Sequence, residues 1–278
     1  MRLILLVALT MAAFAANSLL NRLALAEHAI GPASFAAIRL GSGGLALAGL
    51  LVWRRGLVRF GGAGRAVGVA SLLCYMLGFS FAYVTLQAGT GALILFGGVQ
   101  ITMFSAAVLR REAVPARRWL GAVVAMGGLV WLLRPAAHGA PSGAGAGLMA
   151  AAAVGWGIYS LNGRRTGDPL AATGANFGLA APVAVALALL WPDAVPVTGV
   201  GVALAVGSGV VTSGLGYALW YAVLPQLQAS VASVAQLSVP VIALAGGALV
   251  LGEVPSGQVI AAAAVVLGGV VLSLWPRR

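Results

Sequence analysis

Residues 86–135 read LQAGTGALILFGGVQITMFSAAVLRREAVPARRWLGAVVAMGGLVWLLRP, and this stretch recurs without a gap 141 residues later, at residues 227–276. Rare letters carry the match, because coincidences of alanine and valine mean little in so apolar a chain. The identical pairs are Leu86/Leu227, Gln87/Gln228, Ala88/Ala229, Glu112/Glu253, Gly127/Gly268, Gly128/Gly269 and Pro135/Pro276. Self-similarity at one fixed offset indicates a duplication. We therefore expect two related units, residues 1–140 and 141–278.

The composition is that of an integral membrane protein. Hydrophobic residues make up 61% of the chain and charged residues 8%, and the mean hydropathy is +1.04. The formal charge of +11 would fit a nucleic-acid-binding protein, but all 16 basic residues are arginines, and most stand in short breaks between apolar runs. Arginines at the ends of spanning segments explain this charge, so we expect no nucleic-acid partner.

The apolar runs are each about 20 residues long, the length that crosses a bilayer as a helix. Backbone groups in lipid must be satisfied within the segment, so the sequence predicts an all-α protein with ten transmembrane helices. Their expected positions are 3–25, 33–53, 66–85, 89–109, 118–134, 145–163, 170–191, 198–222, 227–250 and 257–275.

The first run resembles a secretory signal peptide, with Arg2 before it and small residues at positions 12–16. We expect it to remain uncut. The run continues to Ala26 and matches residues 147–164 of the second half, so its removal would leave the halves unequal.

Arginine placement predicts that both termini are cytoplasmic, because loops on that side carry an excess of Arg and Lys. With the N-terminus inside, only Arg22 and Arg134 flank the outer face. The inner face receives thirteen, namely Arg2, Arg54, Arg55, Arg59, Arg65, Arg110, Arg111, Arg117, Arg118, Arg164, Arg165, Arg277 and Arg278. Five helices per half is an odd number, so the second half must cross the membrane inverted. Inverted repeats place a substrate site near mid-membrane at their interface, which makes transport by alternating access the leading hypothesis.

The chain also resembles the drug/metabolite transporter superfamily, and specifically its EamA-type members with ten helices. The features that carry the resemblance are PASFAAIR at 32–39, the Leu251-Gly252-Glu253 triplet, residues 218–232, LSVPV at 237–241 and the paired glycines at 127–128 and 268–269. The resemblance implies a carrier of the bacterial inner membrane that moves small metabolites, often amino acids or their derivatives, and commonly outward. One feature departs from the family: the first half has Arg110-Arg111-Glu112 where the second has the Gly-Glu pair.

Two polar side chains within the expected spans are candidates for substrate binding, because polar groups in lipid are costly and usually face a bundle interior. Arg39 lies in the second segment and would attract a carboxylate; alternatively it extends to the interface or binds backbone carbonyls. Asn17 and Asn21 share one face of the first segment, four residues apart. Asn17 is either a cavity residue or an interhelical hydrogen bonder, and the second role is favoured for Asn21.

Aromatic residues at helical spacing give three segments an aromatic stripe. A cavity walled by aromatics would suit an apolar or aromatic substrate, although such stripes are also typical of packing and of interface belts. Tyr83 and Tyr221 are expected to be belt residues. Gln100 and Gln236 are either cavity donors or interhelical bonders. The aromatic candidates for substrate binding are Tyr75, Phe79, Trp156, Tyr159 and Tyr217.

Proton-coupled carriers usually need a carboxylate or histidine within the spans. Here all five acids fall at or near segment ends, so we expect a facilitator or exchanger, with export as the expected direction. Glu112 and Glu253 are the plausible exceptions, and as a repeat-related pair they more readily cap helices or pair with nearby donors.

Other functional classes find less support in the sequence. An intramembrane enzyme would need a histidine near Ser208 or Ser213, a pair of membrane aspartates or a His-Glu cluster. The sequence has none of these features, so we expect no enzyme, no cofactor and no metal. Multidrug efflux is the alternative substrate class, since an aromatic cavity also serves greasy cations; Arg39 and the lack of an intramembrane acid favour zwitterions or anions. A non-transporting scaffold is a further alternative. A monomer is expected, because each chain contains both halves.

Overall fold

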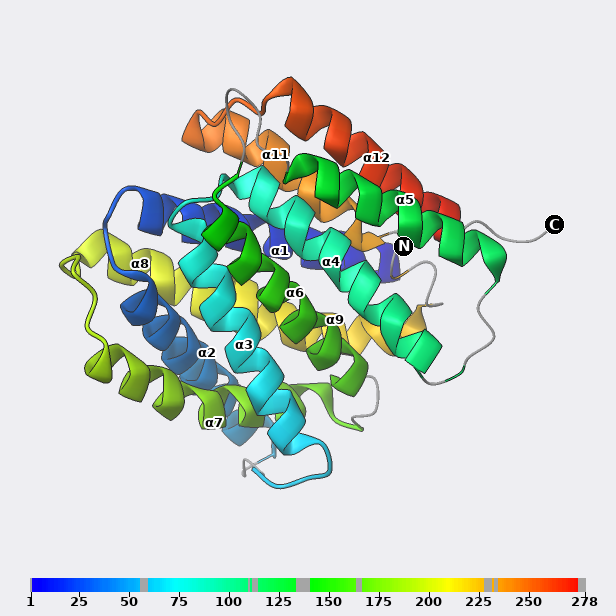
Figure 1. The fold of residues 1–278 in the computed structure, drawn as a ribbon. Helices are drawn as coiled ribbons and strands as arrows, with labels where there is room; N and C mark the ends of the chain where they lie inside the picture. Colours follow the sequence, from blue (N-terminus) through cyan, green and yellow to red (C-terminus); the bar gives the residue numbers. More distant parts are fainter. Residues whose placement is uncertain are drawn as a thin grey trace.

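The computed structural model describes residues 2–55, 60–109, 111, 115–133, 141–163, 167–227, 232 and 235–274. These residues form helices joined by short connections, and no strand occurs among them (Figure 1). Glu112, one of the repeat-related acids, lies outside the described residues. The helices are α1 (Arg2–Ala26), α2 (Pro32–Arg55), α3 (Arg65–Tyr83), α4 (Ala88–Leu109), α5 (Ala116–Leu132), α6 (Gly143–Gly163), α7 (Pro169–Leu190), α8 (Gly199–Gly207), η1 (Ser208–Leu215), α9 (Gly216–Val223), η2 (Leu224–Gln226), α11 (Ser238–Leu251) and α12 (Gly257–Leu274).

Helix ends follow the local sequence. Asp168 caps α7 by accepting a hydrogen bond from the Ala171 N–H at 3.3 Å, and Thr198 caps α8 by accepting one from the Gly201 N–H at 3.1 Å. Such caps satisfy amides that a helix N-terminus leaves free. Gly252 ends α11 with a φ of 65°, a left-handed conformation that glycine adopts without strain. The predicted breaks therefore coincide with physical stop signals.

Seven helical segments in the described residues are long and apolar enough to cross a membrane. One of them is the run Gly199–Gln226, in which α8, η1, α9 and η2 follow one another without a break. Two further apolar helices, Ser238–Val250 and Gly257–Leu272, are shorter, and α5 has 17 residues. The chain is thus a multi-pass membrane protein with an all-helical fold.

The helices pack in pairs that link the two halves of the sequence. The most extensive contacts join α3 to α6, α5 to α12 and α2 to α7, while α4 packs on α6 and α1 on α11. Figure 1 shows α5 and α12 side by side at one edge of the bundle, with α2 and α7 together at another. The most extensive helix–helix contacts therefore join segments that are far apart in the chain.

The segment η1 is a π-helix in the middle of the Gly199–Gln226 span. Its wider turn is rare and commonly marks functional sites. It packs against α1 and α2, and the approach to α2 is close: a Cβ on Gly209 would clash with the backbone carbonyl of Arg39. The π-helix is therefore held directly beside Arg39.

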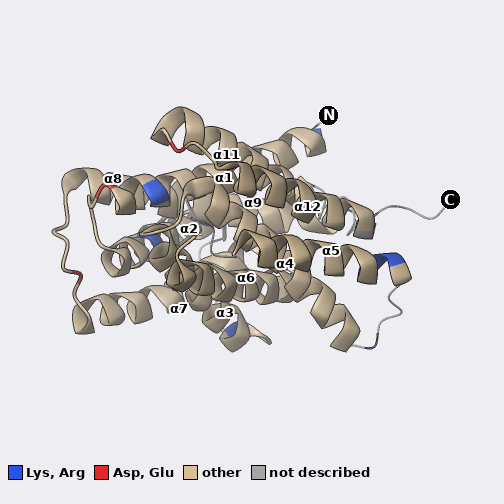
Figure 2. Ribbon diagram, turned by 45° about the horizontal axis from the view of Figure 1, so that its top comes forward, with Lys and Arg blue, Asp and Glu red and all other residues tan. Residues whose placement is uncertain are grey.

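Most charged residues drawn in Figure 2 lie at helix ends and in connections, while the exposed surface carries large apolar side chains such as Trp53, Leu189 and Leu249. Lipid is the natural solvent for such a surface. One sequence expectation is wrong: Tyr83 and Tyr221 are not belt residues, because both are buried in the core. Each hydroxyl donates to a backbone carbonyl, Tyr83 to Ala88 and Tyr221 to Tyr159. These hydrogen bonds offset the cost of burying the hydroxyl groups.

Gly155 of α6 tests the close packing of α3 on α6. A Cβ there would lie 2.7 Å from the backbone N of Tyr75 and 2.8 Å from the carbonyl O of Ser71. Gly155→Ala must push the helices apart, and we expect overpacking of this kind to cost about 1–3 kcal/mol. The readout is the melting temperature of the purified protein in detergent.

Gly147→Ala, in the same helix, is the matched control, because a Cβ at Gly147 meets nothing within 4 Å. Its melting temperature should stay unchanged or rise, since alanine is the better helix former. Equal melting temperatures for the two variants would contradict the close packing of α3 on α6.

Candidate functional site

Arg39 of α2 is the charged centre of the buried core, with 0% of its surface exposed. Its Nε donates a hydrogen bond to Ser213 Oγ at 2.8 Å. Its Nη2 donates to the hydroxyl of Tyr217 at 2.8 Å and to that of Tyr75 at 3.4 Å. Three helical segments, α3, η1 and α9, therefore converge on one guanidinium.

Aromatic rings complete the surroundings of Arg39. Its Cζ lies 5.0 Å from the ring centroid of Phe79 and 5.6 Å from that of Tyr75, distances at which a cation is attracted to a ring face. The remaining nitrogen, Nη1, is buried and has no hydrogen-bond partner. Within the described part of the chain the ion pair between Arg22 and Glu253 is the one salt bridge, so no described acid pairs with Arg39.

Tyr75 and Tyr217 join Arg39 to a larger aromatic cluster. Their hydroxyls lie 2.8 Å apart and share a hydrogen bond. The ring of Trp156 in α6 lies 4.7 Å from that of Tyr217 and 5.0 Å from that of Tyr75, centroid to centroid. Phe14 of α1 meets Trp156 edge-on at 5.5 Å. Helices from both halves of the sequence thus contribute to the aromatic cluster around Arg39.

Asn17 of α1 connects this cluster to the π-helix. Its Oδ1 accepts hydrogen bonds from Ser208 Oγ at 2.7 Å and from Thr212 Oγ1 at 2.9 Å, and its Nδ2 donates to the Tyr75 hydroxyl at 3.5 Å. These interhelical hydrogen bonds match one of the two sequence interpretations of Asn17, and the contact with Tyr75 places Asn17 beside the aromatic candidates. Asn21 bonds to Ser208 and Ser80, as expected for an interhelical link.

The structure brings together six of the sequence candidates, namely Asn17, Arg39, Tyr75, Phe79, Trp156 and Tyr217. Tyr159 lies one ring further out, stacked on Trp156 at 5.7 Å. The hydrogen bonds and ring contacts of the described residues do not reach Gln100 or Gln236, whose buried Nε2 and Oε1 atoms, respectively, have no partner.

Sequence reasoning missed the hydroxyl residues of η1 as members of the site. Ser208 and Ser213 entered only as conceivable nucleophiles, and Thr212 did not enter at all. A usable signal exists: three hydroxyl residues stand within six positions of an otherwise apolar run, and Ser208 and Thr212 share a face at a spacing of four.

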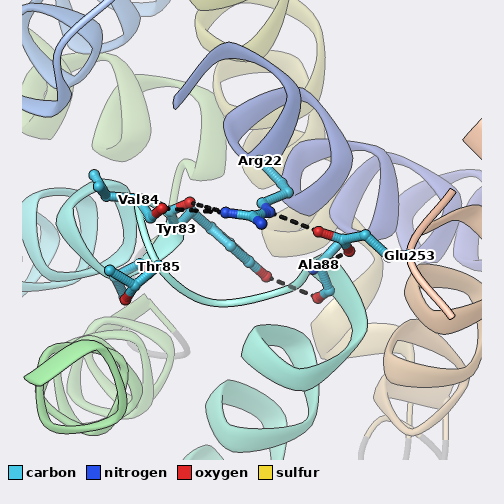
Figure 3. A network of polar contacts seen from close by, with 7 residues as sticks. Arg22, Tyr83, Val84, Thr85, Ala88 and Glu253 are labelled. Atoms are coloured by element: carbon cyan, nitrogen blue, oxygen red, sulfur yellow. Dashed lines mark hydrogen bonds and ion pairs between the residues drawn. The ribbon is translucent and has the colours of Figure 1, made fainter. Parts of the chain in front are cut away.

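A second polar cluster ties together the ends of several helices (Figure 3). Arg22 Nε at the end of α1 donates to Glu253 Oε1 at 2.6 Å. The other carboxylate oxygen, Oε2, accepts from the N–H of Ala88 at the start of α4 at 2.7 Å. Arg22 Nη1 also donates to the carbonyls of Tyr83 and Val84 at 3.2 Å. We call these residues the Arg22–Glu253 clasp. The expectation that Glu253 pairs with nearby donors is confirmed.

The sequence and fold of the chain are similar to those of known proteins. Residues 143–275 match the EamA-like transporter family. The "Uncharacterized protein PA1977" of Pseudomonas aeruginosa is 48% identical over 276 residues, which cover 99% of this chain and 96% of that one. A solved crystal structure, described only as that of a protein, shares the fold with a TM-score of 0.66 and 21% identity over 95% of each chain. Together with the apolar helical bundle, these matches show that the chain belongs to the EamA-like transporter family.

Proposed function

We propose that this protein is a secondary carrier for small carboxylate-bearing metabolites, the class that includes amino acids, and that Arg39 binds the carboxylate. The observation that carries the proposal is the buried guanidinium with a free Nη1 and no acidic partner in the described residues. A buried charge is costly unless it is paired, and a carboxylate would supply the missing charge together with two acceptors for the free nitrogen.

The proposed mechanism is alternating access between two inverted five-helix repeats, residues 1–140 and 141–278, with ten spanning helices. The 141-residue offset supports it, because the helix contacts obey the same offset. It relates α2 to α7 and α5 to α12, and within each pair the two helices contact each other. It also relates the α3–α6 contact to that of η1 and α9 with α1, and all of these occur. A molecule with this internal symmetry can exchange conformations between its halves.

The described conformation seals the Arg39 cluster, since Arg39, Tyr75, Trp156 and Tyr217 are all at most 4% exposed. A substrate would enter when helices at one end separate. The Arg22–Glu253 clasp stands where α1, α3, α4 and the α11–α12 connection meet, at the end that arginine placement predicts to be outside. We propose that the clasp closes this end and that its release opens the outward-facing state.

The cellular setting follows from the same arguments. An excess of arginine on one side supports a bacterial inner-membrane protein with both termini cytoplasmic, and the family resemblance supports export. Two repeats within one chain support a monomer. Multidrug efflux is the weaker alternative, because an unpaired Arg39 repels the cations that such carriers bind.

The first prediction concerns flux through proteoliposomes that contain the purified protein. We expect saturable uptake of labelled carboxylate-bearing metabolites and a fall of about 10- to 100-fold with Arg39→Gln, as for the loss of a charge-assisted hydrogen bond. Arg118→Gln is the matched control, because Arg118 is an exposed arginine at the start of α5.

The Arg39→Gln protein must still elute as a single species in size-exclusion chromatography. Undiminished flux of that variant would remove Arg39 from the binding site while leaving the carrier in place. No saturable flux of any carboxylate would favour drug efflux or a non-transporting scaffold.

The second prediction concerns coupling. Three of the four described acids are engaged at helix ends: Asp193 accepts hydrogen bonds from the N–H groups of Ala33 and Ser34 at the start of α2, Asp168 caps α7, and Glu253 pairs with Arg22. The fourth, Glu27, is exposed just after the end of α1. We expect a facilitator or exchanger, so labelled substrate should show counterflow and should not accumulate against its gradient when only a pH gradient is imposed. Uphill accumulation that an uncoupler abolishes would contradict this.

The third prediction tests the clasp by a double-mutant cycle with Arg22→Gln and Glu253→Gln. Each single change leaves one charge without its partner, so the double variant should be more stable than additivity predicts. The side chains are 18% and 12% exposed, and we expect a coupling free energy on the order of 1 kcal/mol. The measurement is thermal unfolding in detergent, and strictly additive effects would argue that the two side chains are not coupled.

A further inference from the structure

The buried cluster around Arg39 carries one positive charge and a surplus of hydrogen-bond donors, and this combination narrows the substrate class. We propose that the preferred substrate is a net monoanion without an ammonium group: an organic acid, such as a 2-hydroxy or 2-oxo acid, with an apolar or aromatic body. This inference rests on the proposed function, because it concerns the ligand of the same Arg39 site.

The charge balance of the cluster favours an anion over a zwitterion. Arg39 is the only charged side chain among the buried polar residues of the described chain. A monoanion would neutralise the site on binding, whereas an amino acid has no net charge and would bring an additional buried ammonium. A buried ammonium without a carboxylate partner is strongly disfavoured.

The tyrosine pair next to Arg39 adds a donor. Tyr217 and Tyr75 share one hydrogen bond, and both oxygens also accept from Arg39 Nη2. Each phenol has a single hydrogen. Whichever tyrosine donates within the pair, the hydrogen of the other has no acceptor among the described residues. This phenolic hydrogen and the Nη1 group of Arg39 are two unpaired donors within the same cluster, and a carboxylate has two oxygens that accept hydrogen bonds.

The wider core shows the same imbalance. The buried side-chain atoms without a partner include three further groups that only donate: Trp156 Nε1, Trp220 Nε1 and Gln100 Nε2. Gln236 Oε1 is the one that only accepts. Hydroxyl groups can do either and do not affect the balance. A ligand rich in acceptor oxygens would satisfy such a core, and a donor-rich ammonium would not.

Several groups near Arg39 that could hold an ammonium are already engaged. Asn17 Oδ1 accepts from Ser208, Thr212 and Asn21. Asn21 Oδ1 accepts from Ser80. The guanidinium of Arg39 lies over one face of Tyr75 and one face of Phe79, so a second cation beside these rings would meet a like charge.

The test compares acids that differ only in the 2-substituent. Proteoliposomes with the full-length protein are given labelled 3-phenyllactate or phenylalanine, 2-hydroxyisocaproate or leucine, and lactate or alanine, with phenethylamine as a cation. We expect each hydroxy acid to exceed its amino-acid partner in kcat/KM by about tenfold or more, as for an unsatisfied buried charged group. We also expect no saturable flux of phenethylamine.

Arg39→Gln separates this inference from the proposed function. In that variant the flux of the hydroxy acids should fall while the small flux of the amino acids changes less, because the positive charge that favours the anions is gone. Amino acids carried as well as their hydroxy partners, or better, would overturn the inference and leave a carboxylate carrier standing. Flux of phenethylamine alone, or of no compound in the panel, would overturn both.

Discussion

A guanidinium that has no acidic partner among the described residues, enclosed by the helical bundle, is the constraint on which the rest of this structure depends. Burial removes the water that would otherwise solvate Arg39, so the protein must replace it with fixed dipoles and ring faces. Ser213, Tyr217 and Tyr75 provide the dipoles, and Phe79 and Tyr75 the faces. The Nη1 nitrogen of Arg39 has no hydrogen-bond partner among the described residues. These groups come from three different helical segments, so the charge holds those segments in register.

The packing beside Arg39 is arranged to make this enclosure possible. Glycines allow η1 to approach α2 and α6 to approach α3 closely, because at Gly209 and Gly155 a Cβ would strike backbone atoms of the neighbouring helix. The π-helical turn widens the segment that carries Ser208, Thr212 and Ser213, and thereby turns three hydroxyls toward α1 and α2. Close backbone approach and local widening together bring short polar side chains to a long charged one.

The two polar clusters of the molecule differ in their balance of charge. Among the described residues, the Arg39 cluster has a charge but no counter-charge, an arrangement that would favour the binding of an anion. The Arg22–Glu253 clasp pairs its charges and uses the remaining donors and acceptors on backbone groups of α3 and α4. An unpaired charge at the centre and a paired charge at the helix ends suit the proposed carrier, because the proposed site would exchange a ligand whereas the clasp would only open and close.

Much of this could be predicted from the sequence, because hydropathy and repetition are local properties. The apolar runs and their Gly and Pro breaks marked the helices, and a lone arginine in an apolar run marked Arg39. The repeated Leu-Gln-Ala and Gly-Gly letters predict a duplication. Tyr75, Phe79 and Tyr217 followed from helical spacing. Spacing does not say which way a stripe faces, however, so Tyr83 and Tyr221 were misplaced at the interface, and Gln100 and Gln236 were grouped with a cluster whose described contacts do not include them.

Only the tertiary structure decided the partners. Nothing in the order of residues joins Arg22 to Glu253, 231 positions away, or sets Ser213 against Arg39, 174 positions away. Nor did the sequence indicate a π-helix, since its hydrogen bonds depend on how α1 and α2 pack around it. The sequence by itself determined that the chain is embedded in lipid and that its apolar segments are helical, because each segment must satisfy its own backbone hydrogen bonds in lipid. The site required the fold, because hydrogen bonds and ion pairs act over a few ångströms between segments that only packing brings together.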